Sequence, residues 1–520
     1  MSNNNTKVVG IDLGTTYSAI AVLDDLGNPE VIGSIDTNKK ITASAAYING
    51  DNIIVGDKAL DVAKTFPKLV VTEAKRQMEN DAYFSTETGT WVERKENEEK
   101  KGFSPTQISS FILKKLKDYL EGVEKAVITV PAMFAEKARV ATLDAAKLAG
   151  LEVIELINEP TAAILHYASL PGISITGKVM IFDLGGGTFD ITLAEVKNKE
   201  VEVITSRGDK YLGGKDFDNE LLALIQKKYQ EACNTELDIN ESKVDFQKIA
   251  EEMKRVLSVK EKVSEVIHGS GGDHTIEITR NEFEASIQSY LEKLKMLMEE
   301  CLDGSGVNPE DVNHTLLVGG STRVPIVTKT IENVMKKPPL KGVNVDEAVA
   351  NGAAIFAGLK TDKKSLNNAQ QKALSNVHLQ DVCNFYMGTL MNVEDPLYNR
   401  AIDINKVIID RDTPLPASKT TSAQTIRDNQ TAINCQITQS EGKQRDKEFV
   451  NIIHEGDLKL PSNRPKGQPV EITYSYDVSG KMHCVFEDVN SGKKYEVDVR
   501  PKSSEDLKAQ FSEIEEITIE

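Results

Sequence analysis

The sequence predicts an α/β protein followed by an all-β module, and three observations support this prediction. Between residues 7 and about 360, apolar runs typical of strands alternate with amphipathic segments typical of helices. After residue 385, short alternating runs separated by Gly, Pro, Asn and Asp predict β-hairpins. A phrase of Asp, Leu, Gly and Thr also occurs twice, at residues 12–16 and 183–188, each time between two apolar runs.

The elements of the first part are predicted by periodicity. Its expected strands are KVVGIDL, AVITVPA, VMIFDL and TLLVGG, and its expected helices are TQISSFILKKLKDYL, AEKARVATLDAAKLAG and RNEFEASIQSYLEKLKMLMEE. Residues 361–376 are polar and low in aromatic side chains, which predicts a domain boundary with one short helix at most. We therefore expect a domain at 1–374, a linker at 375–384, a β domain at 385–502 and a short acidic tail at 503–520.

The β domain is predicted from five short runs. These are NKVIID, QTAINCQITQS, QPVEITYSYD, GKMHCVFEDV and KKYEVDV. The stretch DVSGKM predicts a tight turn in which Gly480 takes a positive φ. The final stretch, SSEDLKAQFSEIEEITIE, is expected to form one short acidic helix.

The repeated phrase has a chemical interpretation. Turn glycines let backbone N–H groups approach an anion closely, and Thr hydroxyls add donors. An Asp beside phosphates requires a divalent cation between them, so two such turns could hold one polyphosphate with Asp12 and Asp183 facing the metal. The alternative interpretation is a pair of ordinary hairpin turns in which Asp only favours the turn.

Other nucleotide motifs are excluded or indistinct. The chain has no G-x-x-x-x-G-K-S/T loop, and its Gly run is followed by a strand instead of the helix that a Rossmann fingerprint needs. In LLVGGSTRVP, Gly319 and Gly320 end an apolar strand and Ser321 could begin a helix. A nucleoside could pack on these glycines with Arg323 over its face, although this signal is weak by itself.

Composition excludes several classes of protein. A length of 520 residues predicts two or more domains. A net charge of −18 and a pI near 5.1 argue against nucleic-acid or anionic-membrane partners. The N-terminus does not resemble a signal peptide, and no apolar stretch is long enough to span a membrane. Five scattered cysteines favour a reducing compartment, and we expect a cytoplasmic protein.

Six motifs in order resemble the seventy-kilodalton heat-shock protein family, the DnaK-type chaperones. They are GIDLGTTYS, VITVPAMF, INEPTAAIL, IFDLGGGTFD, LGGKDFD and LVGGSTRVP, and the resemblance covers roughly residues 7–500. It implies an actin-like ATPase domain with two lobes around one cleft, followed by a β-sandwich that binds peptides. Each lobe would then contribute one of the two phosphate hairpins.

The resemblance implies a set of site residues. The catalytic residues would be Lys75, Glu159, Asp183 and Asp190, with Asp12 and Asp183 holding Mg²⁺ through water. The ATP or ADP would contact Asp12, Gly14, Thr15, Thr16, Tyr17, Gly185, Gly186, Gly187, Thr188, Gly213, Gly214, Glu251, Lys254, Arg255, Ser258, Gly319, Gly320, Ser321, Arg323 and Asp346. Pro131 and Arg139 would relay the nucleotide state between domains. Without the resemblance, Lys75 would be interpreted as an exposed lysine on a helix.

The chain departs from the family pattern in four places. The linker VHLQDV has His378 and Gln380 where the family has an apolar run, so weak docking of the linker is expected. The β domain keeps Asp428, Asn429 and Gln430, but Ile426 and Ile433 could narrow its peptide channel. About eighteen residues follow residue 502, whereas the family's helical lid takes roughly a hundred. Lys210 stands where the family has Thr, and the usual Pro is missing from residues 43–45.

Three functions fit these features. The first is an ATP-driven chaperone that binds unfolded polypeptides, with a J-domain co-chaperone and a nucleotide exchange factor as partners implied by the family. The second is a nucleotide-binding co-chaperone or scaffold, which the altered linker and the missing lid favour. The third is a small-molecule kinase, since sugar kinases share the actin-like fold, but the β domain argues against it.

Overall fold

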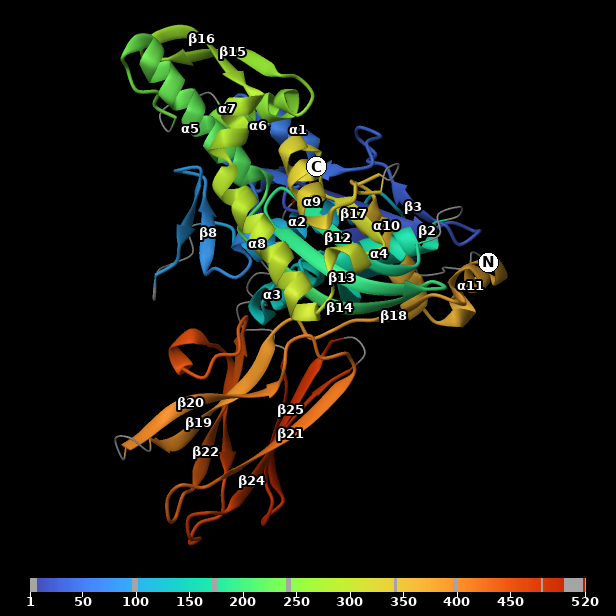
Figure 1. Ribbon diagram of the computed structural model, residues 1–520, viewed down its shortest axis with the longest axis vertical. Coiled ribbons are helices and arrows are strands. Elements are labelled where there is room, and N and C mark those ends of the chain that lie inside the picture. Colours follow the sequence, from blue (N-terminus) through green and yellow to red (C-terminus); the bar gives the residue numbers. More distant parts are fainter. Residues whose placement is uncertain are drawn as a thin grey trace.

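The computed structural model describes residues 7–95, 102–170, 175–239, 245–340, 344–395, 400–477, 480–499 and 518–519. An α/β part forms the upper two thirds of the view in Figure 1, and an all-β part lies below it. The predicted order of an α/β domain followed by a β domain is therefore confirmed at this level. Within the described residues, no helix is both long and apolar enough to cross a membrane.

The first lobe of the α/β part, which we call lobe I, comprises residues 7–158 and is built on a mixed sheet. Its order is β11-β10-β1-β2-β3, with β4 paired to β2. The strands are β1 (Lys7–Asp12), β2 (Tyr17–Leu23), β3 (Pro29–Ile32), β4 (Thr42–Ala43), β10 (Val123–Val130) and β11 (Glu152–Asn158). Strands β1 and β2 form an antiparallel hairpin, as the first copy of the repeated phrase predicts. Helices α2 (Pro105–Lys117) and α3 (Glu136–Leu148) cover the sheet.

A smaller sheet of lobe I carries the segment around Lys75. Its order is β27-β6-β5-β7, and a separate hairpin pairs β8 with β9. The elements are β5 (Ala45–Asn49), β6 (Asn52–Val55), α1 (Asp57–Ala63), η1 (Pro67–Leu69), β7 (Val70–Thr72), η2 (Ala74–Gln77), β8 (Ala82–Ser85), β9 (Thr90–Glu93) and β27 (Thr518–Ile519). The short β27 pairs residues 518–519 with lobe I, which corrects the predicted acidic helix at these two residues, and the rest of that predicted helix, 503–517 and 520, lies outside the described residues.

The second lobe, lobe II, comprises residues 177–335 and repeats the hairpin design. Its sheet order is β17-β12-β13-β14-β18, in which β12 and β13 form the second antiparallel hairpin. The strands are β12 (Gly177–Leu184), β13 (Phe189–Lys197), β14 (Glu200–Asp209), β15 (Lys262–Gly269), β16 (Gly272–Thr279) and β17 (His314–Val318). The helices are α5 (Gly214–Cys233), α6 (Phe246–Leu257), α7 (Arg280–Ser286), α8 (Gln288–Ser305), η3 (Pro309–Asp311), η4 (Gly320–Arg323) and α9 (Pro325–Met335). The single helix expected over residues 280–300 is thus two helices, since Ile287 leaves helical geometry with ψ of 10°.

Two helices connect the lobes. Helices α4 (Glu159–Ser169) and α10 (Ala348–Lys360) share one buried core with residues of both sheets, including Val127 of β10 and Ile181 of β12. Gly352 of α10 allows this close crossing, because an added Cβ would lie 1.7 Å from the Ala162 carbonyl oxygen. The shared core fixes the two hairpins relative to each other.

The β part is a pair of four-stranded antiparallel sheets packed on one core. Their orders are β20-β19-β22-β23 and β21-β24-β25-β26. The bounds are β19 (Tyr386–Asp395), β20 (Arg400–Ile409), β21 (Ala417–Gln424), β22 (Ala432–Ser440), η6 (Lys447–Phe449), β23 (Asn451–Lys459), β24 (Pro469–Tyr476), β25 (Met482–Asp488) and β26 (Lys493–Asp498). Gly480 has a φ of 71° in the expected turn before β25. Strands β19, β21 and β23 were not predicted from the sequence.

The linker between the two parts is docked, which corrects the expectation of weak docking. After η5 (Lys363–Ser365) and the expected short helix, α11 (Asn368–Leu374), residues His378–Gln380 form β18. Strand β18 extends the lobe II sheet in parallel with β14, pairing Leu379 with Val201. The residues that interrupt the apolar run, His378 and Gln380, are exposed, whereas Leu379 packs on the core. The linker docks because β18 pairs with β14 through its backbone, and only every second side chain of a strand faces the core.

Candidate nucleotide site

The turns of the two hairpins face each other. An added Cβ on Gly186 would lie 1.9 Å from the hydroxyl of Thr16, and one on Gly187 would lie 2.6 Å from the methyl of Thr15. Only glycine allows the backbones of the two turns to come so close. The structure therefore brings together the two copies of the repeated phrase.

Four acidic side chains and one lysine gather behind these turns. Asp12 ends β1, and Asp183 on β12 lies opposite Asp190 on β13. Lys75, from η2, forms a buried ion pair with Glu159, the first residue of α4. Both side chains of this pair are more than nine-tenths buried. Lys75 is thus part of a buried site instead of an exposed helix face.

Burial and mutual repulsion perturb the acids of this cluster. Burial, reinforced by the charge of Glu159, raises the pKa of Asp12 to about 7. The same two causes raise the pKa of Asp190 to about 8 and that of Asp183 well above its usual range. One lysine cannot neutralise four carboxylates, so the cluster favours a further cation or protons.

The cluster suits a hydrated divalent cation. One oxygen of Asp190, Oδ2, is buried and has no hydrogen-bond partner among the described residues. Within those residues, no three acids, histidines or cysteines converge closely enough to chelate a metal by themselves. Mg²⁺ keeps several of its waters and binds through one or two carboxylates together with phosphates, so these residues fit a water-mediated Mg²⁺ site.

Most of the remaining predicted residues border a cavity of about 610 Å³ between the lobes. Helix α6 supplies Glu251, Lys254, Arg255 and Ser258, and the β17–α9 turn supplies Gly319, Gly320, Ser321 and Arg323. Asp346 also borders it, together with Gly14, Thr15, Thr16, Tyr17, Gly185, Gly186, Thr188 and Gly214. Gly187, Gly213 and Asp190 do not border the cavity and lie directly behind it, with Gly213 packed against Gly187.

Hydrogen bonds connect the two sides of this cavity. Arg255 of α6 donates to the hydroxyl of Tyr17 in lobe I at 2.8 Å. Ser321 donates to the Gly185 carbonyl at 2.8 Å, which fixes the third glycine turn against the second hairpin. The guanidinium of Arg323 forms two hydrogen bonds of 2.8 Å with Asp346 at the cavity edge. The cavity is therefore polar at both ends and bounded by both lobes.

Three residues at the candidate site, Asp218, Lys215 and Thr129, were not predicted from the sequence. Asp218 is almost fully buried and pairs with Lys254 at 2.7 Å, and Lys215 borders the cavity. Both belong to the motif LGGKDFD. Asp218 follows Gly214 by four residues on α5, so helical spacing could have indicated that both face the cavity. Thr129, whose hydroxyl donates to Asp12 at 2.9 Å, had no signal beyond its place in VITVPA.

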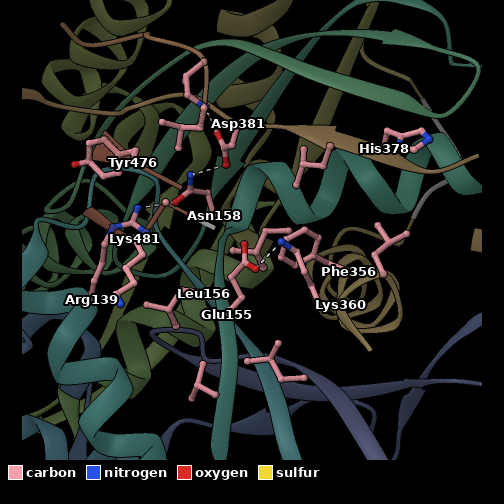
Figure 2. Close-up of a pocket in the computed structure, with 18 of the residues that line it drawn as sticks. Arg139, Glu155, Leu156, Asn158, Phe356, Lys360, His378, Asp381, Tyr476 and Lys481 are labelled. Atoms are coloured by element: carbon pink, nitrogen blue, oxygen red, sulfur yellow. Dashed lines mark hydrogen bonds and ion pairs between the residues drawn. The ribbon is translucent and has the colours of Figure 1, made fainter. Parts of the chain in front are cut away.

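A second cavity, of about 640 Å³, lies between the α/β part and the β part (Figure 2). Arg139, one of the two predicted relay residues, donates to the side chain of Asn158 at 2.6 Å. Asn158 in turn donates to Asp381 of the linker at 3.1 Å. Figure 2 shows these side chains pointing toward one another across the cavity. The other relay residue, Pro131, is buried at the end of β10.

The residues that the sequence predicts for a peptide channel lie at or near the surface of the β part. The Ile426 side chain is 45% exposed, and Ile433 is partly buried against the sandwich core. Asp428 accepts a hydrogen bond from the Lys466 N–H at 2.9 Å, and Gln430 accepts one from the Ile426 N–H at 3.0 Å. The Asp-Asn-Gln signature therefore stabilises the turn before β22.

Comparison with known proteins agrees with this arrangement. The family model described as Hsp70 protein matches residues 8–518. The chain is 32% identical to the mitochondrial heat shock 70 kDa protein of Pisum sativum over 526 residues, covering 95% of this chain and 73% of that protein. It is 34% identical to the chaperone protein DnaK of Thermotoga petrophila over 529 residues, covering 97% and 83%. The DnaK of Thermotoga neapolitana is also 34% identical, over 532 residues, covering 98% and 83%.

Proposed function

Because the chain belongs to the Hsp70 protein family, we propose that the cleft between its lobes binds ATP with Mg²⁺ and hydrolyses it. The protein is an ATP-dependent chaperone that hydrolyses ATP and binds unfolded polypeptides. The observation that supports our choice of site is the gathering of four buried carboxyl groups around Lys75 behind two facing glycine turns. This arrangement is suited to polyphosphate and a cation.

We assign the phosphates to the two turns. Their backbone N–H groups and the hydroxyls of Thr15, Thr16 and Thr188 would donate to the phosphate oxygens. Mg²⁺, when bound, supplies positive charge that offsets both the phosphates and the acidic cluster. Asp12 and Asp183 would hold its water ligands, and the adenosine would lie between α6 and the Gly319–Arg323 turn.

We assign the chemical step to Lys75, Glu159 and Asp190. Lys75 would stabilise the negative charge that develops on the terminal phosphate. Glu159 holds the lysine by their ion pair, which limits its motion without neutralising the whole cluster. Among the described residues, Asp190 Oδ2 has no hydrogen-bond partner, so this oxygen would help to orient the water that attacks the phosphate.

The domain plan follows from the same proposal. Residues 1–374 would form an actin-like nucleotide domain, 375–384 the linker and 385–502 a sandwich that holds extended apolar segments. A J-domain protein and a nucleotide exchange factor would be its co-chaperones. A cytoplasmic location is supported by five cysteines that are all free.

A steady-state ATPase assay with and without an unfolded peptide tests this function. We expect slow, Mg²⁺-dependent hydrolysis that Lys75→Ala lowers about 100- to 1000-fold, because one group that stabilises transition-state charge is removed. Lys75→Ala should still bind nucleotide in calorimetry. The matched control is Lys64→Ala, a lysine with a 62% exposed side chain in lobe I. Wild-type protein that hydrolyses no more ATP than buffer would refute the proposal.

The scaffold alternative loses its main support in this structure. It rested on an altered linker, and the linker is paired with the lobe II sheet. Peptide-stimulated hydrolysis would exclude a scaffold that has no coupled cycle.

A further inference from the structure

The short helix that carries Lys75 is bound to lobe II by three ion pairs. Helix η2 has only four residues, and a single 3₁₀ turn is weakly stabilised by its own hydrogen bonds. Acidic and basic side chains within and beside η2 reach across the cleft to residues 210–216, between β14 and the start of α5. The pairs are Glu73 with Lys215 at 3.3 Å, Arg76 with Asp216 at 3.1 Å, and Glu79 with Lys210.

All three pairs join lobe I to lobe II. They flank Lys75 on both sides in sequence, so they act on the same short segment. Their side chains are between 11% and 29% exposed. Salt therefore screens the attraction within these pairs less than it screens fully exposed pairs. Several charges in one network contribute more than an isolated surface pair. We call these six side chains the η2 latch.

Lys210 and Glu79 connect the latch to further contacts. The second carboxylate oxygen of Glu79 accepts a hydrogen bond from the Ala135 N–H at 3.2 Å. The next N–H, that of Glu136 at the start of α3, donates to Gln439 of the β part at 3.2 Å. Lys210 lies two residues after Gly208, whose Cα faces the carboxylate of Asp190. Through the backbone of Ala135 and Glu136, the pair is therefore one residue away from the contact with the sandwich.

We propose that Lys210 is a positioning residue for ATP hydrolysis, which holds η2 and hence Lys75 against lobe II through Glu79. Because every pair of the latch joins lobe I to lobe II, opening of the cleft would separate these pairs and free η2 from lobe II. The same latch opposes opening of the cleft, so it slows nucleotide release. This inference rests on the proposed function, since it assigns Lys210 a role in that same site.

The test compares Lys210→Met with Lys293→Met. Lys293 also forms an ion pair close to the site, with Asp209, but both of its residues belong to lobe II. Two rates are measured for each variant: single-turnover hydrolysis at saturating ATP, and dissociation of a fluorescent ADP analogue. We expect Lys210→Met to slow hydrolysis and accelerate dissociation, each about two- to fivefold. Lys293→Met should match the wild type, and Lys210→Arg should restore both rates.

The dependence of nucleotide dissociation on ionic strength distinguishes a role of the latch from a purely structural role of Lys210. Dissociation from the wild type should accelerate as salt rises, because salt screens the pairs, and this dependence should weaken in Lys210→Met. Glu79→Gln, which keeps an acceptor for the Ala135 N–H, serves as the second variant should Lys210→Met fold poorly. Equal rates in the wild type, Lys210→Met and Glu79→Gln would overturn the inference.

Failure of the inference differs from failure of the proposed function. A wild type that binds nucleotide without hydrolysing it would refute the proposed function, while the dissociation rates would still test the latch. A wild type that hydrolyses ATP, together with an unaffected Lys210→Met, would refute the latch alone.

Discussion

Asp183 illustrates at the scale of one residue how burial prepares a cation site. Its pKa lies well above the usual range because it is buried near three other carboxyl groups. A carboxylate in such a place is stabilised by a nearby cation, so its charge should matter most when Mg²⁺ is present.

We therefore expect Asp183→Asn to weaken Mg-ATP binding about 10- to 100-fold, as loss of a group that orients metal ligands does. Binding of ATP without metal should change much less. Calorimetric titrations with Mg²⁺ and with a chelator measure both affinities. Asp61→Asn, at a 74% exposed side chain, is the control. Equal losses in the two titrations would show that Asp183 is structural.

His166 makes stability depend on pH. It is 92% buried in α4, and burial lowers its pKa to about 4. The folded form therefore stays neutral while the unfolded chain takes up a proton below about pH 6.5, so stability falls as pH falls from 6.5 toward 4. The shift predicts a loss of about 3 kcal/mol over this window.

The measurement compares thermal unfolding of the wild type and His166→Leu from pH 7.5 to 4.5. The difference isolates the histidine from the carboxyl groups, which titrate in both proteins. The variant should become relatively more stable as pH falls. His268→Leu, at an exposed histidine, is the control. Parallel curves for the wild type and His166→Leu would contradict the prediction.

At the scale of elements, β18 shows that a strand tolerates polar residues at alternate positions. Leu379 packs on the core that α4 and α10 share, while His378 and Gln380 face solvent. Because β18 is an edge strand of the lobe II sheet, its docking depends on backbone pairing with β14 and on this one inward side chain.

We expect Leu379→Asp to abolish docking, because a charge would be buried in an apolar core. ATP should then no longer accelerate peptide release, which the wild type should show. His378→Asp, at an exposed position of the same strand, should keep the acceleration. Stopped-flow release of a labelled peptide measures the effect. From the sequence alone, ATP is expected to change the rate of peptide release little even in the wild type. A wild type that behaves in this way would show that docking of β18 does not transmit the nucleotide state to the β part.

At the scale of the whole molecule, one loop of the β part joins it to lobe II. Asp412 pairs with Arg207 at 3.0 Å and accepts a hydrogen bond from Thr205 at 2.8 Å. Arg411 contributes a further bond to the Ser206 carbonyl at 2.5 Å. These contacts lie beside the docked linker, since all three partners belong to β14.

Asp412→Asn should weaken this contact by about 1–3 kcal/mol, because Arg207 keeps its burial and loses its counter-charge. Asparagine suits the position, since Asp412 has a φ of 63° that Asn tolerates better than most residues. Fluorescence energy transfer between lobe II and the sandwich should then fall in the ATP state. Asp410→Asn, whose partners Lys419 and Lys443 both belong to the sandwich, should leave it unchanged.

The sequence by itself predicted many of the elements and part of the candidate site. The hairpins β1–β2 and β12–β13, the helices α2 and α3 and the turn at Gly480 follow from local signals. Local signals suffice there because apolar periodicity and turn chemistry act over a few residues. The repeated phrase also indicated that Asp12 and Asp183 would share one site, since both end a strand before a glycine turn.

Tertiary structure alone decided the pairings between distant segments. The break at Ile287, the docking of β18, the return of β27 to lobe I and the pair of Lys210 with Glu79 had no signal in the sequence. Each depends on which surfaces meet once the chain has folded, and for β18 this surface is the core that α4 and α10 share. Strand pairing and ion pairs between lobes are set by this packing, so residue type at either partner cannot specify them alone.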